Sequence, residues 1–226
     1  MHNELEVCDI LLKSDHFTDR EKAEILILGG HQRRLVQMQS LNNLREKAID
    51  ILAANAPWKK RYKSFEDLFR EIKMLVCIFD LDYIGPLTIY DIAKRQSRYL
   101  NCYPKEFVYA WRHSLTGAMN LLKNDINLSK NKQAIIPTSI FSPYFLGLDS
   151  IDVENILCIM CKCFSYHKVV TTSITIDINF KCHILYVNIN LAIKIYYYLL
   201  SIKYDMTKVV FYQLKKYPNA LLKTKP

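Results

Sequence analysis

Apolar residues recur every three or four positions along most of this chain, which is the spacing of one face of an α-helix. The fold class that we predict is therefore mostly α, with a helical domain over residues 1–163. The helices expected from this pattern cover residues 4–13, 19–28, 35–41, 41–52, 64–79, 88–100, 115–122 and 151–161.

Residues that cap helices stand at several of these boundaries. Thr18 precedes the second helix and Glu21 follows three positions later, which is the spacing of a capping box. Ser64 begins a later helix, and either Asp149 or Ser150 begins the last one. The broad apolar face of the helix after Ser64 predicts burial of Phe65, Leu68, Phe69, Ile72, Leu75, Val76 and Phe79.

Some stretches between the helices have less regular patterns. Residues 107–111 form either a short strand or a helical turn, because so short an apolar run fits both. Gly117 lies within a predicted helix, where it permits the close approach of another backbone. Residues 123–149 are polar at first and then interrupted by Pro137 and Pro143, so we expect an irregular connection there.

The composition changes abruptly after Cys163, and we predict a domain boundary there. Residues 164–226 contain no Gly, Glu, Arg or Trp and are rich in Ile, Lys, Asn and Tyr. This basic, aromatic C-terminal extension has a potential for β structure, because residues 171–179 alternate with a period of two.

The mostly apolar run over residues 184–202 has three interpretations. A membrane span is disfavoured, because Lys194 near its middle costs roughly 2.5–3.5 kcal/mol on insertion scales. We favour an amphipathic helix or a hairpin that packs on the main body. The third alternative is that the extension is translated from a compositionally biased, A/T-rich stretch and has no evolved role.

The charge and the cysteine content indicate which cellular setting and which binding partners to expect. The net charge of +9 favours acidic partners such as nucleic acid, but the charge is concentrated in the extension, whose nine lysines meet only Asp177 and Asp205. Seven cysteines and an N-terminus without an apolar leader predict a reducing, cytoplasmic setting. We expect most of the cysteines to be small apolar core residues.

Residues 81–98 are the most informative stretch for function. Gly85 can adopt a positive φ, Pro86 fixes the next φ, and Thr88 is placed to cap the helix that follows. A helix start presents free N–H groups and a partial positive charge, which suit a phosphate. The residues that we expect to contact nucleic acid are Gly85, Pro86, Leu87, Thr88, Lys94, Arg95 and Arg98. The basic clusters at residues 31–34 and 59–63 extend this patch if they share its face.

The run Ile84-Gly85-Pro86-Leu87-Thr88 resembles the second half of the helix-hairpin-helix element of DNA-binding proteins, whose pattern is Leu-Pro-Gly-hydrophobic-Gly-Pro-x-Thr-Ala. Asp82 and Tyr83 stand where that pattern has Pro and its first Gly. The resemblance implies DNA as the partner. In its enzymatic form, the base-excision glycosylases, it implies an acidic group about twenty residues beyond the hairpin, where Glu106 is the nearby carboxylate.

A longer segment, residues 31–161, resembles a family of uncharacterised bacterial proteins with a Gly-x-Leu-Thr-x-Tyr-Asp core. The residues that carry this resemblance are 85–93 and the run Tyr103-Pro104-Lys105-Glu106-Phe107-Val108-Tyr109. Residues 114–118 lack the Arg of the family's Thr-Arg-x-Gly-Ala stretch. The resemblance implies a shared fold and no particular reaction.

We predict no catalytic residue, no cofactor and no metal. The Arg112-His113-Ser114 run has no Asp at a spacing that suggests a triad, and Cys158 and Cys161 lie in an apolar helical pattern without the turns of zinc sites. The function expected is a non-enzymatic nucleic-acid-binding module. The alternative is a helical protein-interaction or structural protein, and a base-excision glycosylase is the third candidate.

Overall fold

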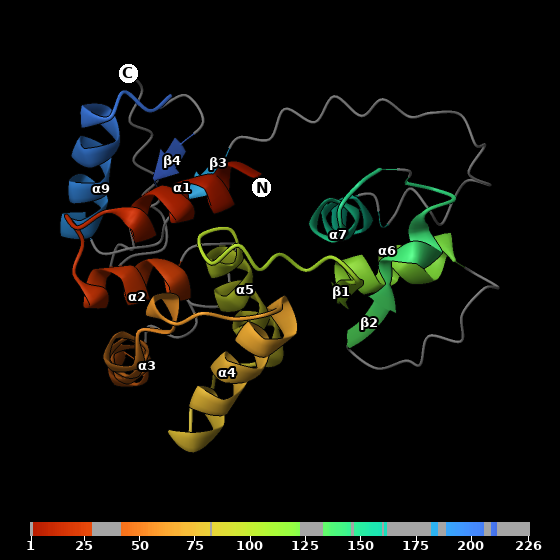
Figure 1. Cartoon of the computed structure of the whole chain (residues 1–226), viewed down its shortest axis with the longest axis horizontal. Helices are drawn as coiled ribbons and strands as arrows, with labels where there is room; N and C mark the ends of the chain where they lie inside the picture. The colour runs from red at the N-terminus through yellow and green to blue at the C-terminus, as the bar shows by residue number, and fades with distance from the viewer. Residues whose placement is uncertain are drawn as a thin grey trace. The chain divides into compact units, whose positions relative to one another are not determined.

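The computed structural model describes residues 2–28, 42–81, 83–122, 133–145, 147–159, 161, 182–184, 189–205 and 209–211. Helices dominate this part of the chain, which confirms the predicted fold class (Figure 1). The α-helices are α1 (His2–Lys13), α2 (Asp19–Leu28), α3 (Asn42–Asn55), α4 (Phe65–Ile78), α5 (Pro86–Ser97), α6 (His113–Leu121), α7 (Ser150–Ile159) and α9 (Ile189–Ser201). Short 3-10 helices are η2 (Pro57–Lys59) and η3 (Thr138–Phe141), and the strands are β1 (Phe107–Trp111), β2 (Gln133–Pro137), β3 (Cys182–Ile184) and β4 (Val209–Phe211).

The chain folds as two compact units. Unit 1 comprises Met1–Tyr103 together with Asn179–Pro226, and unit 2 comprises Pro104–Ile178. These units differ from the two segments, residues 1–163 and 164–226, that the composition predicts. Apolar side chains of α9, in the C-terminal extension, belong to a core cluster of unit 1.

Helix α5 packs against α1, α2 and α4 within unit 1. Its apolar residues Ile89, Ile92 and Ala93 are buried, as the spacing predicts. Burial also includes Tyr90 and the polar residues 94–97, so the second half of the helix has little solvated surface. Because three helices surround α5, the usual division into a buried and a solvated face does not apply to it.

Helix α2 begins with the predicted capping box. The amide of Thr18 donates to the Glu21 carboxylate at 2.8 Å, and the amide of Glu21 donates to the Thr18 hydroxyl at 3.2 Å. This reciprocal pair satisfies two of the N–H groups that a helix start leaves without partners. The helix expected over residues 35–41 lies outside the described residues.

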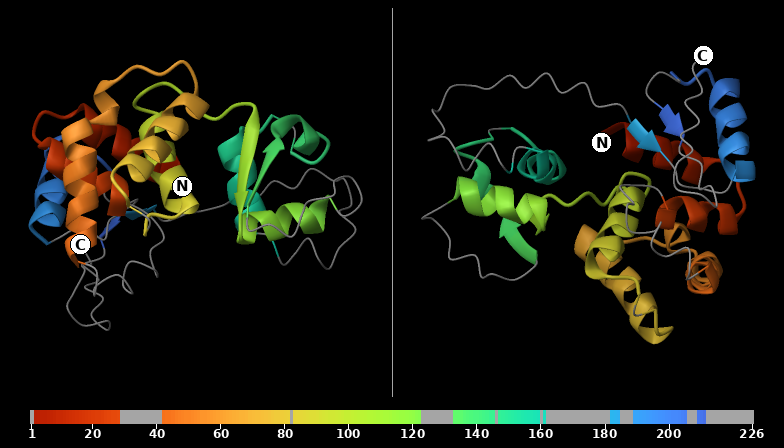
Figure 2. Two further views of the ribbon diagram at one scale, coloured as in Figure 1. Left: turned by 90° about the horizontal axis from the view of Figure 1, so that it is seen from below. Right: turned by 180° about the vertical axis from the view of Figure 1, so that it is seen from behind.

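Helix α9 packs on α1 and α2, which confirms the interpretation of the apolar run as a helix on the main body. Leu191, Ile195 and Leu199 are buried in one cluster with Val7 and Leu11 of α1 and with other residues of unit 1. The back view in Figure 2 shows α9, in blue, beside α1, in red. No described helix has the length and the apolar character that a membrane crossing requires.

The extension also contains strands, in agreement with its predicted potential for β structure. Residues 182–184 of β3 pair in parallel with residues 209–211 of β4, and α9 lies between them in the chain. Together they form a β-strand, helix, β-strand crossover. The strand-like stretch at residues 171–179 lies outside the described residues.

Helix α4 begins at its predicted cap, because the Ser64 hydroxyl accepts a hydrogen bond of 3.2 Å from the amide of Asp67. The buried part of its predicted apolar face consists of Phe65, Leu68, Ile72 and Leu75. The rest of that face is not fully buried: Phe69 and Val76 are half-buried, and Phe79 is 38% exposed. The predicted face is therefore buried at Phe65, Leu68, Ile72 and Leu75, and it becomes exposed at Phe79.

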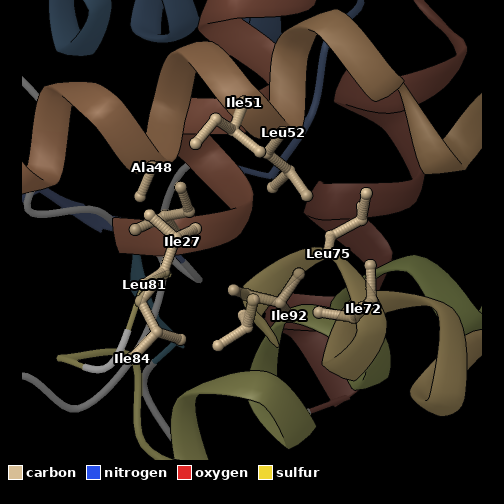
Figure 3. A pocket seen from close by; sticks show the side chains of 10 residues that line it. Ile27, Ala48, Ile51, Leu52, Ile72, Leu75, Leu81, Ile84 and Ile92 are labelled. Carbon is tan, nitrogen blue, oxygen red and sulfur yellow. The ribbon is translucent and has the colours of Figure 1, made fainter. Parts of the chain in front are cut away.

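Aliphatic side chains of α2, α3, α4 and α5 meet around a small recess in unit 1 (Figure 3). Ile27, Ala48 and Leu75 are among its lining residues, and its volume is about 10 Å³. That volume holds about one water molecule, and a site for water also needs polar partners. The recess is therefore a gap in apolar packing and offers no polar group to a ligand.

Unit 2 is built on two antiparallel strands. Strand β1 pairs with β2 in the register Phe107 with Pro137 and Trp111 with Gln133, which decides between the two alternatives for residues 107–111 in favour of a strand. Strand β2 and η3 occupy part of the stretch predicted to be irregular. The prediction of an irregular connection relied on Pro137 and Pro143, but Pro is tolerated in an edge strand, and β2 belongs to a two-stranded sheet.

Helices α6 and α7 pack closely in unit 2, and Gly117 is the point of closest approach. A Cβ atom at Gly117 would lie 2.1 Å from the carbonyl oxygen of Leu157, so the predicted role of this glycine is confirmed. Helix α7 begins at Ser150, and the Asp149 side chain caps it by accepting from the amide of Asp152 at 2.8 Å. The Ser150 hydroxyl donates instead to the carbonyl of Pro104.

Candidate nucleic-acid interface

The turn before α5 has a different backbone conformation from the one expected. Gly85 has φ −73° and ψ 166°, which is extended backbone that any residue adopts. A Cβ atom there would meet nothing within 4 Å. The turn is closed by a 2.8 Å hydrogen bond from the amide of Ile84 to the carbonyl of Leu81. The conformational freedom of glycine is therefore not used at Gly85.

The start of α5 is open at the surface. Gly85 is the N-cap residue and Pro86 is the first helical residue, so Thr88 lies within the first turn and is not the cap that we predicted. No side-chain hydrogen bond caps this start, and the first turn holds no acidic residue. Pro86 is exposed, and Leu87 and Thr88 are half-buried. The first backbone N–H groups of α5 therefore have no side-chain acceptor at this helix start.

Lys94 and Arg95 are buried, which corrects the prediction that they offer charge to a phosphate. Lys94 is 7% exposed, and its Nζ atom lies 5.4 Å from the centre of the Tyr90 ring. Arg95 is 4% exposed, and its Nη1 atom donates at 2.6 Å to the carbonyl of Leu26. That carbonyl is in the last turn of α2, where helices leave C=O groups unpaired and attract cations. Arg95 therefore stabilises the end of another helix.

Arg98 is exposed, but it lies far from the turn. At 1.5 Å per residue, Lys94 is about 12 Å along the helix axis from Pro86, and Arg98 is farther still. The Nε atom of Arg98 lies 3.9 Å from Oδ2 of Asp9, which also accepts from Lys13 at 2.9 Å. The structure therefore does not bring the predicted cations together with the open start of α5.

The basic cluster at residues 59–63 is partly neutralised by ion pairs. Lys59 Nζ lies 2.5 Å from Oδ2 of Asp19, and Lys60 pairs with Glu71. Arg61 and Lys63 are exposed. The other basic cluster, at residues 31–34, lies outside the described residues. A continuous cationic surface that follows a phosphate backbone is therefore not assembled from the described members of these clusters.

The residues considered for catalysis either make structural hydrogen bonds or are exposed to solvent. Ser114 is 1% exposed, and its hydroxyl accepts from the amide of Trp111 at 2.8 Å and donates to the carbonyl of the same residue at 3.0 Å. Glu106 is exposed before β1, and its backbone carbonyl accepts from Thr138 at 2.8 Å. Among the described residues, no three His, Cys, Asp or Glu side chains gather in a way that would hold a metal ion.

Sequence reasoning missed an exposed apolar surface at the end of α4. Met74 is 48% exposed, Ile78 is 66% exposed and Phe79 is 38% exposed, and Cys77 is exposed between them. We call these four residues the α4 apolar end. The signal was present in the sequence: residues 74–79 are six consecutive apolar residues, more than one buried face of a helix can cover.

Comparison of the chain with protein-family models, with curated proteins and with solved structures gives no match. The resemblances to helix-hairpin-helix proteins and to the bacterial family therefore stay predictions that depend on short motifs. The function has to be inferred from the geometry of the described residues.

Proposed function

We propose that this chain is a helical protein-interaction protein that binds an amphipathic helix of a partner protein through the α4 apolar end. The observation that supports the proposal is the exposure of apolar side chains that lie together there. Clustered apolar exposure is typical of interaction sites, whereas single exposed apolar residues are common everywhere. A cytoplasmic setting belongs to the same proposal, and the free thiols of Cys77, Cys102 and Cys161 support it.

The shape of the α4 apolar end suits a helix. Met74 and Ile78 are four positions apart and form one ridge, and Phe79 lies beside it at the last turn. Ridges of this spacing pack into the grooves of another helix at interaxial distances of about 8–10 Å. A partner helix with an apolar stripe would therefore bury both residues of the ridge at once.

Charges beside the ridge determine the chemistry of the partner. Arg70 lies one turn before Met74 on the same stripe, and Lys73 lies beside it; both are exposed. Arg70 is 3.4 Å from Asp67, a pair that is exposed and therefore weak. We infer that the partner helix carries an acidic residue next to its apolar stripe, where it would meet Lys73 and fix the direction of binding.

Replacement of Ile78 by Lys tests the proposal without disturbing the fold. Because Ile78 is 66% exposed, we expect the free energy of unfolding to change by less than about 0.5 kcal/mol. Binding should weaken by about 2 kcal/mol or more, which is roughly 30-fold, because a charge would enter the apolar contact. A photo-cross-linking residue at position 78, in cells that make the protein, should give a discrete product that Lys73→Glu removes.

The matched control carries the same photo-cross-linking residue in place of Lys63, which is exposed in the loop before α4. The proposal predicts that peptide sequencing of the product at position 78 identifies an amphipathic helix with an acidic residue. Identical products at positions 63 and 78 would contradict a specific site. A product with the mass of two copies of this chain would identify a second copy, not another protein, as the partner.

Nucleic-acid binding stays as a second candidate, supported by the open start of α5 and by the net charge of +9. It predicts retention on a DNA duplex that weakens steeply between about 50 and 200 mM salt, because each phosphate contact releases counterions. A flat response to salt would remove this candidate. Met74 and Ile78 have no part in such binding, so Ile78→Lys separates the two candidates.

A further inference from the structure

Strand β2 has a free edge in the sheet of unit 2. Among the described residues, β1 lies beside one edge of β2 and no strand lies beside the other, and the left view of Figure 2 shows the two strands side by side. Helices α6 and α7 pack against β1, and Ile136 of β2 is buried in the core cluster of this unit. The far edge of β2 is therefore the place where a further strand can extend the sheet.

The register of the sheet shows which backbone groups of β2 point away from β1. The amide of Thr138 donates to the carbonyl of Glu106 at 2.8 Å, and the pairing continues from there through β2 without a break. In an antiparallel pair, residues that exchange hydrogen bonds with the opposite strand alternate with residues that do not. Ile136 therefore bonds to β1. The outward groups are the N–H and C=O groups of Gln133 and Ile135 and the C=O group of Pro137.

The side chains along this edge are uncharged, and one of them is apolar and exposed. Residues 133–137 include no charged side chain, and Ile135 is 58% exposed. Native proteins protect free edges with charged residues, with proline or with short strands, and β2 has only the last two of these features. A segment that pairs with β2 is therefore short, with about five residues that span roughly 17 Å.

We propose that the free edge of β2 binds an extended segment of a partner protein as a third strand. The occupant is a strand because Gln133 and Ile135 offer outward backbone groups at a spacing of about 6.8 Å, and an extended chain presents its own donors and acceptors at the same spacing. The residue opposite Ile135 is apolar, because the two side chains lie together on one face of the sheet. This site lies in unit 2 and is independent of the α4 apolar end.

A second copy of β2 fits this edge less completely than a chain without proline. Antiparallel pairing of two β2 strands along their full length would place Gln133 opposite Pro137 of the other copy. Because proline has no N–H group, the carbonyl of Gln133 would then lack a donor in both copies. A segment without proline at that position donates to all three outward carbonyls. The edge therefore favours a different chain as the occupant.

Hydrogen exchange in the free, full-length protein tests the edge itself. The amide of Ile135 should exchange rapidly because it points to solvent, whereas the amide of Ile136 should be protected by its bond to β1. Nuclear magnetic resonance of the ¹⁵N-labelled protein measures the two amides separately. Equal protection of both amides in the free protein would show that the chain itself already covers this edge, and it would overturn the proposal.

Cross-linking in cells that make the protein tests the occupant. A photo-cross-linking residue replaces Gln133, which is exposed on β2. We expect a discrete product with another protein, which Ile135→Pro should remove because proline takes away the outward N–H group. Ile135→Val keeps that group and should keep the product. The absence of a product, or a product that persists in Ile135→Pro, would overturn the proposal.

Thermal unfolding of the variants separates a loss of pairing from a loss of the fold. Ile135→Pro should keep the thermal transition, because the Ile135 amide makes no bond to β1 and proline is tolerated at a strand edge. Ile136→Pro should lower the transition, because it removes a hydrogen bond of the ladder. If Ile135→Pro also unfolds, Ile135→Lys is the second variant: its charge lies on an exposed position and should reduce the product several-fold.

A synthetic peptide with the sequence of the cross-linked segment completes the test. At ten times its Kd, it should slow exchange of the Ile135 amide about tenfold. The amide of Arg61, in an exposed loop of unit 1, should exchange at an unchanged rate. Unchanged exchange at Ile135 would overturn the proposal. A cross-linked segment that comes from a second copy, or from another part of the same chain, would also overturn it and would identify that segment as the occupant.

Discussion

At the scale of single residues, burial decides what a charged side chain does. Lys94, Arg95 and Arg98 occur within five positions of one another at the end of α5, yet two of them are inside the protein and one is outside. Arg95 reaches the end of α2, and Arg98 lies at the surface near Asp9. The sequence shows three cations close together but does not show which of them water can reach.

Arg95→Met should destabilise the protein without affecting a nucleic-acid surface. The Met side chain keeps the apolar stem but leaves the buried Leu26 carbonyl without its donor, so we expect a loss of about 1–3 kcal/mol in the free energy of unfolding. Arg98→Met, at the exposed position, should cost less than about 1 kcal/mol. Chemical denaturation of both variants measures the difference. If the Arg95→Met protein were stable but no longer bound a DNA duplex, Arg95 would contact nucleic acid, as we predicted from the sequence.

The cysteines differ in reactivity for a similar reason. Burial, together with the nearby carboxylate of Glu66, raises the pKa of the Cys102 thiol from its ordinary value of 9.0 to about 11. Cys77 is exposed in the α4 apolar end. Alkylation of the native protein near neutral pH, followed by mass spectrometry, should therefore modify Cys77 rapidly and leave Cys102 protected until the protein unfolds.

The same shift of pKa gives a pH dependence of stability. Between about pH 9 and 11 the Cys102 thiol ionises in the unfolded chain but stays protonated in the folded one, so the unfolded state binds fewer protons and stability falls as pH rises. Replacing Cys102 by Ala should make the stability flatter over this range. An unchanged slope in Cys102→Ala would show that other groups cause the alkaline loss.

At the scale of elements, a glycine matters where two helices touch. Gly117→Ala would place a methyl group 2.1 Å from the carbonyl oxygen of Leu157, so α6 and α7 would have to separate, at a cost of about 1–3 kcal/mol. Hydrogen exchange and thermal unfolding should show unit 2 destabilised. Gly85→Ala is the matched control, because a Cβ atom there meets open space and φ is −73°. Equal effects of the two substitutions would contradict the packing argument.

Helix α4 shows which structural features can be predicted from residues close together in the sequence and which cannot. Its cap at Ser64 and its first buried turns agree with the prediction, because both depend on residues within a few positions of each other. Exposure of Met74, Ile78 and Phe79 does not follow from the pattern, since it depends on where α2, α3 and α5 end relative to α4. The sequence therefore contains the α4 apolar end as an apolar run, but it does not show that this run is exposed.

At the scale of the whole molecule, the C-terminal extension is part of the fold. A chain that ends at Cys163 lacks Leu191, Ile195 and Leu199, each of which contributes about 1.5–3 kcal/mol by burial. Their sum is comparable with the net stability of about 5–15 kcal/mol of a typical domain. We therefore expect the truncated chain to lose its cooperative thermal transition, as followed by circular dichroism. An unchanged transition would show that the extension is an appendage after all.

A point substitution in α9 is the control for that truncation. Ile195→Ala removes part of a side chain that is fully buried and should cost about 2–5 kcal/mol. Tyr197→Ala changes a side chain that is 66% exposed and should cost less than about 0.5 kcal/mol in an isolated copy. If both substitutions had the same small effect, α9 would not belong to the core of unit 1.

The sequence by itself determined the helical fold class, the caps at Thr18 and Ser64, and the close approach at Gly117, because spacing and capping act over a few residues. Only the tertiary structure decided that other helices enclose α5 and that apolar side chains at the end of α4 are exposed. It also decided that α9 completes the core of unit 1. The reason is physical: burial depends on which distant segments surround a side chain, and that information is not local. The predicted phosphate site depended on local sequence at the turn and on the exposure of Lys94 and Arg95. The structure corrects the second of these, because both side chains are buried.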